Sequence, residues 1–213
     1  WEKRVIFTKL GKYSVFLQGK PNDAMLQIKI FQVNPLGANC YVCWEDAGHA
    51  CIVVDPGFYR ADEEDMVFNF LTENGLQPDA VFLTHAHFDH ISAIPELQRA
   101  YPDLPVFISD ADAKIISHPF NQFPPDYPPI SDINFYRRVR PFCRSLAEDL
   151  QAFVAELGWT TTVEVIDSRG HTPGGVCYLF KTGDGKPDTL FSGDTLFCCS
   201  VGRTDFPGGD MTT

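Results

Sequence analysis

Basic residues are scarce in this sequence, and long apolar runs are absent. The 213 residues include 17 Lys and Arg against 28 Asp and Glu, which gives a formal net charge of −11. So acidic a chain repels the phosphate backbone of a nucleic acid, which argues against a nucleic-acid partner. No stretch approaches the ~20 apolar residues that cross a bilayer, and the first residues lack the pattern of a secretory signal. We therefore expect a cytoplasmic protein with a small-molecule substrate and no membrane partner.

The seven cysteines are odd in number and spread along the chain, which does not suggest a disulfide framework. Reduced thiols in a cytosolic protein explain them better. Cys40 and Cys43 form a C-x-x-C pair inside a strand-like run, but no second pair accompanies them, so a zinc ribbon is not expected. Cys198 and Cys199 are adjacent and close in sequence to Asp194, and we expect them to lie in a strand.

A chain of this length with 44% hydrophobic residues can bury one full core. Period-two runs predict strands, and 3.6-residue spacing predicts helices. The expected strands are 26–33, 40–45, 50–55, 80–84, 106–108, 162–167, 176–181 and 189–191. The expected helices are 62–74, 92–101, 111–117 (capped by Asp110) and 144–158. Two β-rich halves separated by helices predict an α/β (α+β) fold, a four-layer αββα sandwich with the helices outside.

Organised sequence begins at Met25, where the first convincing strand starts. We therefore expect residues 1–25 to be an N-terminal extension that lies upstream of the natural start. Residues 26–213 form the folded domain in this interpretation.

Candidate metal ligands gather directly after the expected strand 80–84. His85, His87, Asp89 and His90 fall within six positions. Imidazole and carboxylate groups are preferred ligands of divalent transition metals. Because side chains alternate along a strand, His85 and His87 can converge on one ion. Four ligands in so short a segment exceed what one tetrahedral ion takes from a turn, which indicates a two-metal site.

Two further candidates, His171 and Asp194, each follow a strand and lie in a glycine-containing loop. Ligands presented from several strand ends can meet at one rim of a sandwich. His85, His87 and His171 offer three imidazoles to a first ion, which is the ligand set of an open hydrolytic zinc site.

A second ion can take Asp89 and His90, with Asp194 bridging the two ions. Such a pair lowers the pKa of a shared water towards ~7 and polarises a carbonyl oxygen. An attacking hydroxide then forms at neutral pH without a Ser or Cys nucleophile.

Four segments carry a resemblance to a known family. They are Thr84-His-Ala-His-Phe-Asp-His90, Gly170-His-Thr-Pro-Gly174, Ser192-Gly-Asp-Thr-Leu-Phe197 and Gly202-Arg-Thr-Asp-Phe-Pro-Gly-Gly209. In order and spacing the first three are similar to the metallo-β-lactamase superfamily, and the fourth resembles its glyoxalase II-like (hydroxyacylglutathione hydrolase-like) members.

The resemblance implies the αββα sandwich and two Zn²⁺ ions, with Fe or Mn as alternatives. It implies that the first metal is held by His85, His87, His171 and Asp194. The second metal is then held by Asp89, His90 and Asp194, and Asp89 also orients the metal-bound hydroxide. The implied activity is hydrolysis of a thioester such as S-lactoylglutathione.

The sequence departs from the family pattern in two ways. The family supplies one more His to the second metal from near its C-terminus, whereas this sequence ends at Thr213 with no His after His171. We interpret the metallo-β-lactamase-like domain as cut short at its C-terminal end, with a weaker second site. The helical domain with which glyoxalase II holds glutathione is also missing, so the thioester substrate rests on the resemblance alone.

Other interpretations remain open. Sulfur (persulfide) dioxygenases of the superfamily use one iron held by two His and one Asp, and they share the loop type that begins at Gly202. An inactive fragment is a third possibility. Arg203 and Asp205 in that loop form either a local ion pair or a support for the metal ligands. The acyl group, the native metal and the oligomeric state stay open.

Overall fold

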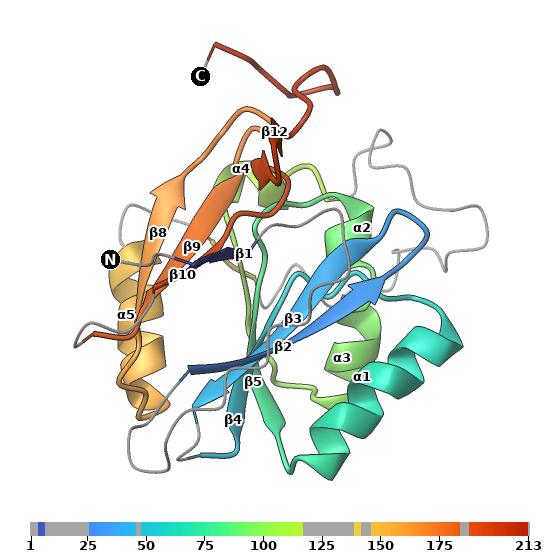
Figure 1. Cartoon of the computed structure of the whole chain (residues 1–213), viewed down its shortest axis with the longest axis vertical. Coiled ribbons are helices and arrows are strands. Elements are labelled where there is room, and N and C mark those ends of the chain that lie inside the picture. The colour runs from blue at the N-terminus through green and yellow to red at the C-terminus, as the bar shows by residue number, and fades with distance from the viewer. Residues whose placement is uncertain are drawn as a thin grey trace.

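The computed structural model describes residues 4–6, 26–45, 48–116, 139–141, 146–183 and 188–212. Two sheets dominate this part of the chain, and helices flank them (Figure 1). No helix in the described ranges is long and apolar enough to cross a membrane.

The larger sheet has six strands in the order β2-β3-β4-β5-β6-β7. Their bounds are β2 Leu26–Val33, β3 Ala38–Glu45, β4 Ala50–Val54, β5 Gln77–Phe82, β6 Val106–Ile108 and β7 Val139–Pro141. β2, β3 and β4 pair antiparallel, whereas β4 to β7 pair in parallel. The carboxyl ends of β4, β5 and β6 therefore meet at one edge of the sheet.

The smaller sheet has the order β1-β10-β9-β8. Its strands are β1 Arg4–Ile6, β8 Thr162–Asp167, β9 Val176–Lys181 and β10 Thr189–Phe191. β1 lies within the expected N-terminal extension and pairs in parallel with β10. Whether residues 1–25 precede the natural start stays a prediction.

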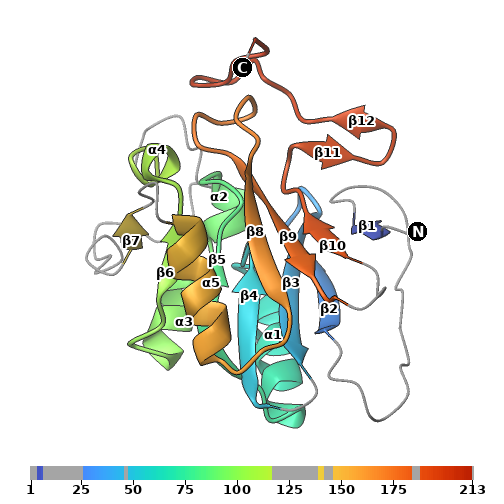
Figure 2. The same cartoon turned by 90° about the vertical axis from the view of Figure 1, so that its left-hand side faces the viewer.

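A separate two-stranded hairpin follows the smaller sheet. It consists of β11 Leu196–Phe197 and β12 Ser200–Val201. The hairpin stands above β10, near the C-terminal end of the chain (Figure 2). Cys198 and Cys199 form the turn between its strands, so the expectation that they lie in a strand is wrong.

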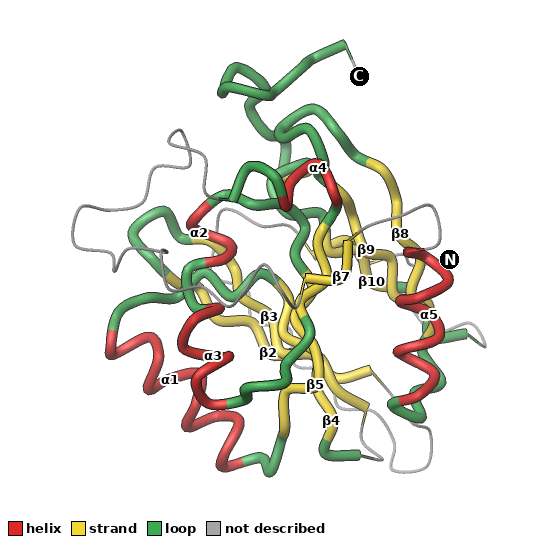
Figure 3. The backbone as a smooth tube through the Cα atoms, turned by 180° about the vertical axis from the view of Figure 1, so that it is seen from behind, coloured by secondary structure: helices red, strands yellow, loops and turns green. Residues whose placement is uncertain are grey.

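Helices cover the outside of the sheets. They are α1 Ala61–Glu73, α2 Phe88–Ile91, α3 Ile94–Ala100, α4 Asp110–Ala113 and α5 Leu146–Glu156. α1 and α3 lie beside the larger sheet, and α5 runs along β8 on the opposite side (Figures 1 and 3). The predicted αββα sandwich is confirmed.

Strand β3 shows why the sheets pack in layers. Its side chains alternate between the two faces. Val42 points to the helices and packs in a cluster with Val67 and Leu71 of α1. Tyr41 and Cys43 point the other way, into the core between the sheets, where the Tyr41 ring meets Phe191 edge-on with centroids 4.9 Å apart. Apolar residues on both faces of β3 place it in the middle of the sandwich.

Two details of the helices differ from the predictions. The helix expected over 92–101 is α3, and a separate one-turn helix, α2, precedes it at 88–91, where no helix was expected. Pro95 lies in the first turn of α3, where its missing N–H leaves no helical hydrogen bond unmade. The cap of α4 is Ser109, whose side chain accepts a hydrogen bond from the Asp112 amide, rather than the expected Asp110.

Candidate metal centre

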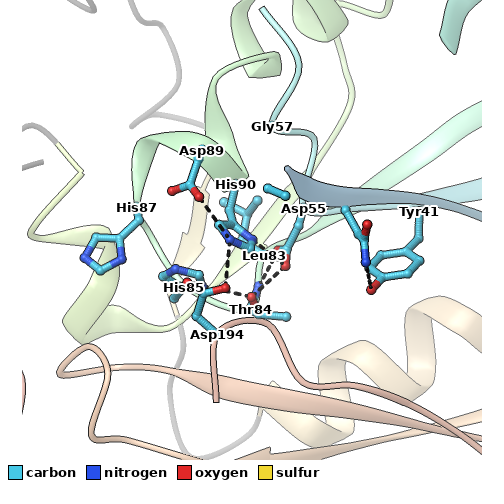
Figure 4. Close-up of polar contacts among 12 residues, drawn as sticks. Tyr41, Asp55, Gly57, Leu83, Thr84, His85, His87, Asp89, His90 and Asp194 are labelled. Carbon is cyan, nitrogen blue, oxygen red and sulfur yellow. Dashed lines mark hydrogen bonds and ion pairs between the residues drawn. The ribbon is translucent and has the colours of Figure 1, made fainter. Parts of the chain in front are cut away.

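The candidate ligands lie just beyond the ends of strands, and Figure 4 shows five of them near one another: His85, His87, Asp89, His90 and Asp194. His85 and His87 follow β5, whereas Asp89 and His90 lie on the one-turn helix α2. His171 lies between β8 and β9, and Asp194 follows β10. The structure brings all six together, and we call them the His/Asp cluster: His85, His87, Asp89, His90, His171 and Asp194.

One end of the cluster consists of three imidazoles. A ring nitrogen from each of His85, His87 and His171 lies within 4.8 Å of the others. Nδ1 of His87 is 2.9 Å from Nε2 of His171. Three nitrogen donors around one point can hold a metal ion such as zinc.

The other end of the cluster mixes rings and carboxylates. His85, His90 and Asp194 form a second group whose ligand atoms lie within 4.8 Å of one another. Nε2 of His90 is 3.3 Å from Oδ1 of Asp194 and 3.6 Å from Oδ2 of Asp89. Oδ2 of Asp194 is 3.6 Å from Nε2 of His171. Asp194 thus reaches towards both ends, the position that a bridging carboxylate needs.

Outer hydrogen bonds fix the protonation of three rings. Nδ1 of His171 lies 2.7 Å from the Arg203 carbonyl, and Nδ1 of His90 lies 3.0 Å from Oδ2 of Asp55. Because these oxygens only accept, each Nδ1 must carry the proton. The Thr84 hydroxyl donates to Asp55 and therefore accepts from Nδ1 of His85 at 3.0 Å. With Nδ1 protonated, the neutral form of each ring has its lone pair on Nε2, the atom that then binds a metal.

The pKa values of His87 and His90 are also consistent with a bound cation. Burial, together with His171, lowers the pKa of His87 to about 3, so this ring is neutral at physiological pH. Burial alone would lower the pKa of His90, but the carboxylates of Asp89 and Asp55 hold it well above its usual value. Positive charge is thus favoured beside His90, and divalent ions bound there would supply it.

Asp55 is a supporting residue that the sequence analysis read only as the end of a strand. Its side chain is completely buried. Oδ1 accepts a hydrogen bond from the Thr84 amide at 2.8 Å, and Oδ2 accepts one from the Thr84 hydroxyl at 2.7 Å and faces His90. Its position at the carboxyl end of β4, next to parallel β5, was the signal that could have identified it.

Asp112 on α4 is a second supporting residue that the sequence analysis missed. Its buried carboxylate accepts from the Ala86 amide at 2.9 Å and from the Gly174 amide at 2.6 Å. Ala86 stands between His85 and His87, and Gly174 belongs to the loop that carries His171. Asp112 therefore joins the two loops that supply the three imidazoles.

Replacing Asp112 by Asn is expected to weaken the contact between the two loops. The Asn side chain places an NH₂ group opposite one of the two amide donors, so one hydrogen bond is lost, at a cost of ~1–3 kcal/mol in the free energy of unfolding. Loss of an outer partner should lower metal affinity about 10–100-fold. Metal content after dialysis and urea unfolding measure both effects. Asp110→Asn, on the same helix, is the matched control, and equal metal retention by the two variants would contradict the role.

Two glycines let the backbone approach the cluster. A Cβ on Gly57 would overlap the carbonyl oxygen of Asp89, and a Cβ on Gly202 would overlap that of Asp194. Any side chain at these positions would displace a candidate ligand, so packing against the cluster requires glycine there.

Arg203 and Asp205 form a local ion pair. The guanidinium donates to the carboxylate at 2.7 and 2.8 Å and stacks on Phe206, with Cζ 3.9 Å from the ring centroid. The Phe206 ring in turn lies 5.8 Å from that of His87. The Arg203 side chain thus shapes the loop, while its backbone carbonyl contacts His171.

Comparison with known proteins agrees with this geometry. A sequence profile of the metallo-beta-lactamase superfamily matches residues 33–213. The probable metallo-hydrolase YqgX of Bacillus subtilis is 31% identical over 182 residues, covering 85% of this chain and 76% of YqgX. A hydroxyacylglutathione hydrolase of Hamiltonella defensa is 29% identical over 180 residues, covering 83% of this chain and 55% of that protein. The crystal structure of TTHA1623 in a di-iron-bound form has a TM-score of 0.61 and 30% identity, covering 86% of this chain and 80% of that one.

Proposed function

The chain belongs to the metallo-beta-lactamase superfamily, and from this premise we propose that it is a metal-dependent hydrolase that cleaves a thioester. One observation carries the proposal. His171 lies more than 80 residues beyond His85 and His90 in the sequence, yet all three rings have Nδ1 engaged from outside and Nε2 turned inward beside Asp194. Such an arrangement suits metal binding and has no evident structural purpose.

The donor set fits two divalent ions. In the proposal His85, His87, His171 and Asp194 hold the first ion. Asp89, His90 and Asp194 hold the second. Zinc suits these donors, and iron or manganese can replace it; the di-iron form of TTHA1623 supports a choice of metal that is not fixed by the fold. When bound, the ions supply a water of lowered pKa and polarise the carbonyl to be attacked.

The residues around the ions position the reactants. Asp89 reaches the cluster from α2, with Oδ2 3.6 Å from Nε2 of His90. Its carboxylate can accept a hydrogen bond from the attacking water and so orient it towards the substrate carbonyl. Asp55 and Thr84 keep the rings of His85 and His90 in place during this step. No Ser or Cys nucleophile is required.

The substrate is the finer part of the proposal. The hydroxyacylglutathione hydrolase relative supports a thioester of glutathione, such as S-lactoylglutathione. That relative is much longer than this chain, so contacts to the glutathione portion are not carried over. A small-molecule substrate also agrees with the net charge of −11, which disfavours nucleic acid. We further propose a cytoplasmic location.

The test follows thioester cleavage by the metal-free protein before and after addition of zinc. We expect turnover of S-lactoylglutathione or another acyl thioester only with metal, because the cluster contains no Ser or Cys nucleophile and the attacking water needs the metal to lower its pKa. Absence of metal-dependent cleavage of every thioester tried would overturn the proposal. Oxygen uptake with iron and glutathione persulfide would point instead to a sulfur dioxygenase. Less than one ion per chain would favour an inactive fragment.

A further inference from the structure

Two exposed thiols stand side by side at the tip of the β11–β12 hairpin. Cys198 and Cys199 are both exposed, whereas Cys40, Cys43, Cys51 and Cys177 are buried. These two are the only exposed thiols in the part of the chain that the structure describes. Their Sγ atoms are 3.8 Å apart.

This separation is that of a thiol–thiol hydrogen bond, and it is also close to the spacing of two sulfur ligands on one atom. A directly bonded sulfur pair requires roughly 2.05 Å. Two sulfurs held at ~2.3 Å by one tetrahedral centre lie about 3.8 Å apart. Both side chains are exposed, so small rotations about χ1 can shorten the distance for a pyramidal arsenic centre or lengthen it for a larger ion such as Cd²⁺.

The backbone at this turn is also unusual. Cys199 has φ +64°, a left-handed conformation that costs a non-glycine residue of order 1 kcal/mol or more. Glycine would remove that cost, yet a thiol occupies the position. The hairpin is tied at its base by the Gly202 amide, which donates to the Thr195 carbonyl at 3.2 Å. A short, closed hairpin keeps both thiols at one tip.

We propose that Cys198 and Cys199 form a bidentate site for a soft, thiophilic centre, either a trivalent arsenical or a d¹⁰ metal ion such as Cd²⁺. Thiolate ligands select soft centres over hard ones. With a monosubstituted arsine oxide, R–As=O, two As–S bonds form and the As=O bond breaks. The two thiol protons leave with the oxygen as one water, and no oxidant is needed. The His/Asp cluster offers no sulfur, so it can form neither the dithioarsine nor a cadmium–thiolate bond.

The test uses phenylarsine oxide on the full, metal-loaded chain, read by intact-protein mass. We expect one adduct per chain, with a mass gain of one reagent less one water, on the wild type. Cys198→Ser and Cys199→Ser should each lose it, because a single thiol cannot close the chelate. Cys143→Ser, which changes a thiol outside the pair, is the matched control and should keep it. Cys199→Gly also removes the thiol while relieving the backbone, so it separates loss of binding from loss of fold.

A second arm adds Cd²⁺ to the same zinc-loaded proteins and follows the ultraviolet cadmium–thiolate absorption. A signal in both arms that needs both cysteines supports the proposal, and a signal in one arm identifies which soft centre the site takes. Adduct formation that survives in the Ser variants would overturn it, as would no signal in either arm. Neither readout requires hydrolysis, so this inference and the proposed function can fail separately.

Discussion

Asp194→Asn is expected to lower metal affinity by at least about 100-fold, since loss of even an outer partner of a ligand costs about 10–100-fold. Asp194 is the residue whose two oxygens face different ends of the cluster, towards His90 at 3.3 Å and His171 at 3.6 Å. Asn keeps the size and one oxygen but loses the negative charge and the second ligand oxygen. Metal analysis after dialysis against a weak chelator, followed by thioester cleavage, measures the result.

Asp205→Asn is the matched control for this variant. Asp205 lies eleven positions further along the chain, beyond the β11–β12 hairpin, and is paired with Arg203 on the surface. An exposed ion pair contributes little to stability, so the control should bind metal as the wild type does. If Asp194→Asn kept two ions per chain, the bridging assignment would be wrong.

Asp55→Ala is expected to reduce the free energy of unfolding by ~3–5 kcal/mol, the usual cost of removing one partner of a buried charged contact. The change leaves the Thr84 amide, the Thr84 hydroxyl and His90 Nδ1 without their acceptor. It also places Ala at φ +50°, which favours Gly, Asn or Asp. Because two cluster rings lose their orientation, metal affinity should fall as well. Urea unfolding of the metal-free protein measures the stability term by itself.

Asp55→Asn separates the effect of the lost hydrogen bonds from that of the backbone conformation at residue 55. Asn tolerates the same backbone conformation and still accepts one hydrogen bond, so we expect a smaller loss of ~1–3 kcal/mol. Its NH₂ group cannot accept from His90, and metal affinity should therefore fall in both variants. Equal stability of Asp55→Ala and the wild type would show that the carboxylate does not support the cluster.

The sequence predicted the sandwich and the convergence of the six cluster residues because each of those signals is local. The close spacing of His85, His87, Asp89 and His90 predicts a metal site. The alternation of apolar and polar residues predicts strands such as β2, β8 and β9. The supporting carboxylates gave no such signal. Asp55 acts 29 residues from Thr84, and Asp112 acts through backbone amides 26 and 62 residues away. These long-range hydrogen bonds depend on which strands and loops lie side by side in the fold, and composition and periodicity do not specify that.

Helix α2 shows a different limit. The helix predicted over 92–101 corresponds to α3, whereas no helix was predicted at 88–91. The omission matters for the site, because α2 carries Asp89 and His90. A helix of four residues is too short to show an apolar periodicity, so the sequence pattern did not indicate it.

The His/Asp cluster draws on both sheets, from His85 after β5 to Asp194 after β10. With these residues as ligands, a nascent chain could not capture its ions until the smaller sheet had been synthesised and had docked. Ions that bind only the native state add stability in proportion to the logarithm of their concentration, about 4 kcal/mol at a thousandfold excess over the dissociation constant. The supply of metal in the cell would then govern how long the protein survives proteolysis, as well as how fast it works.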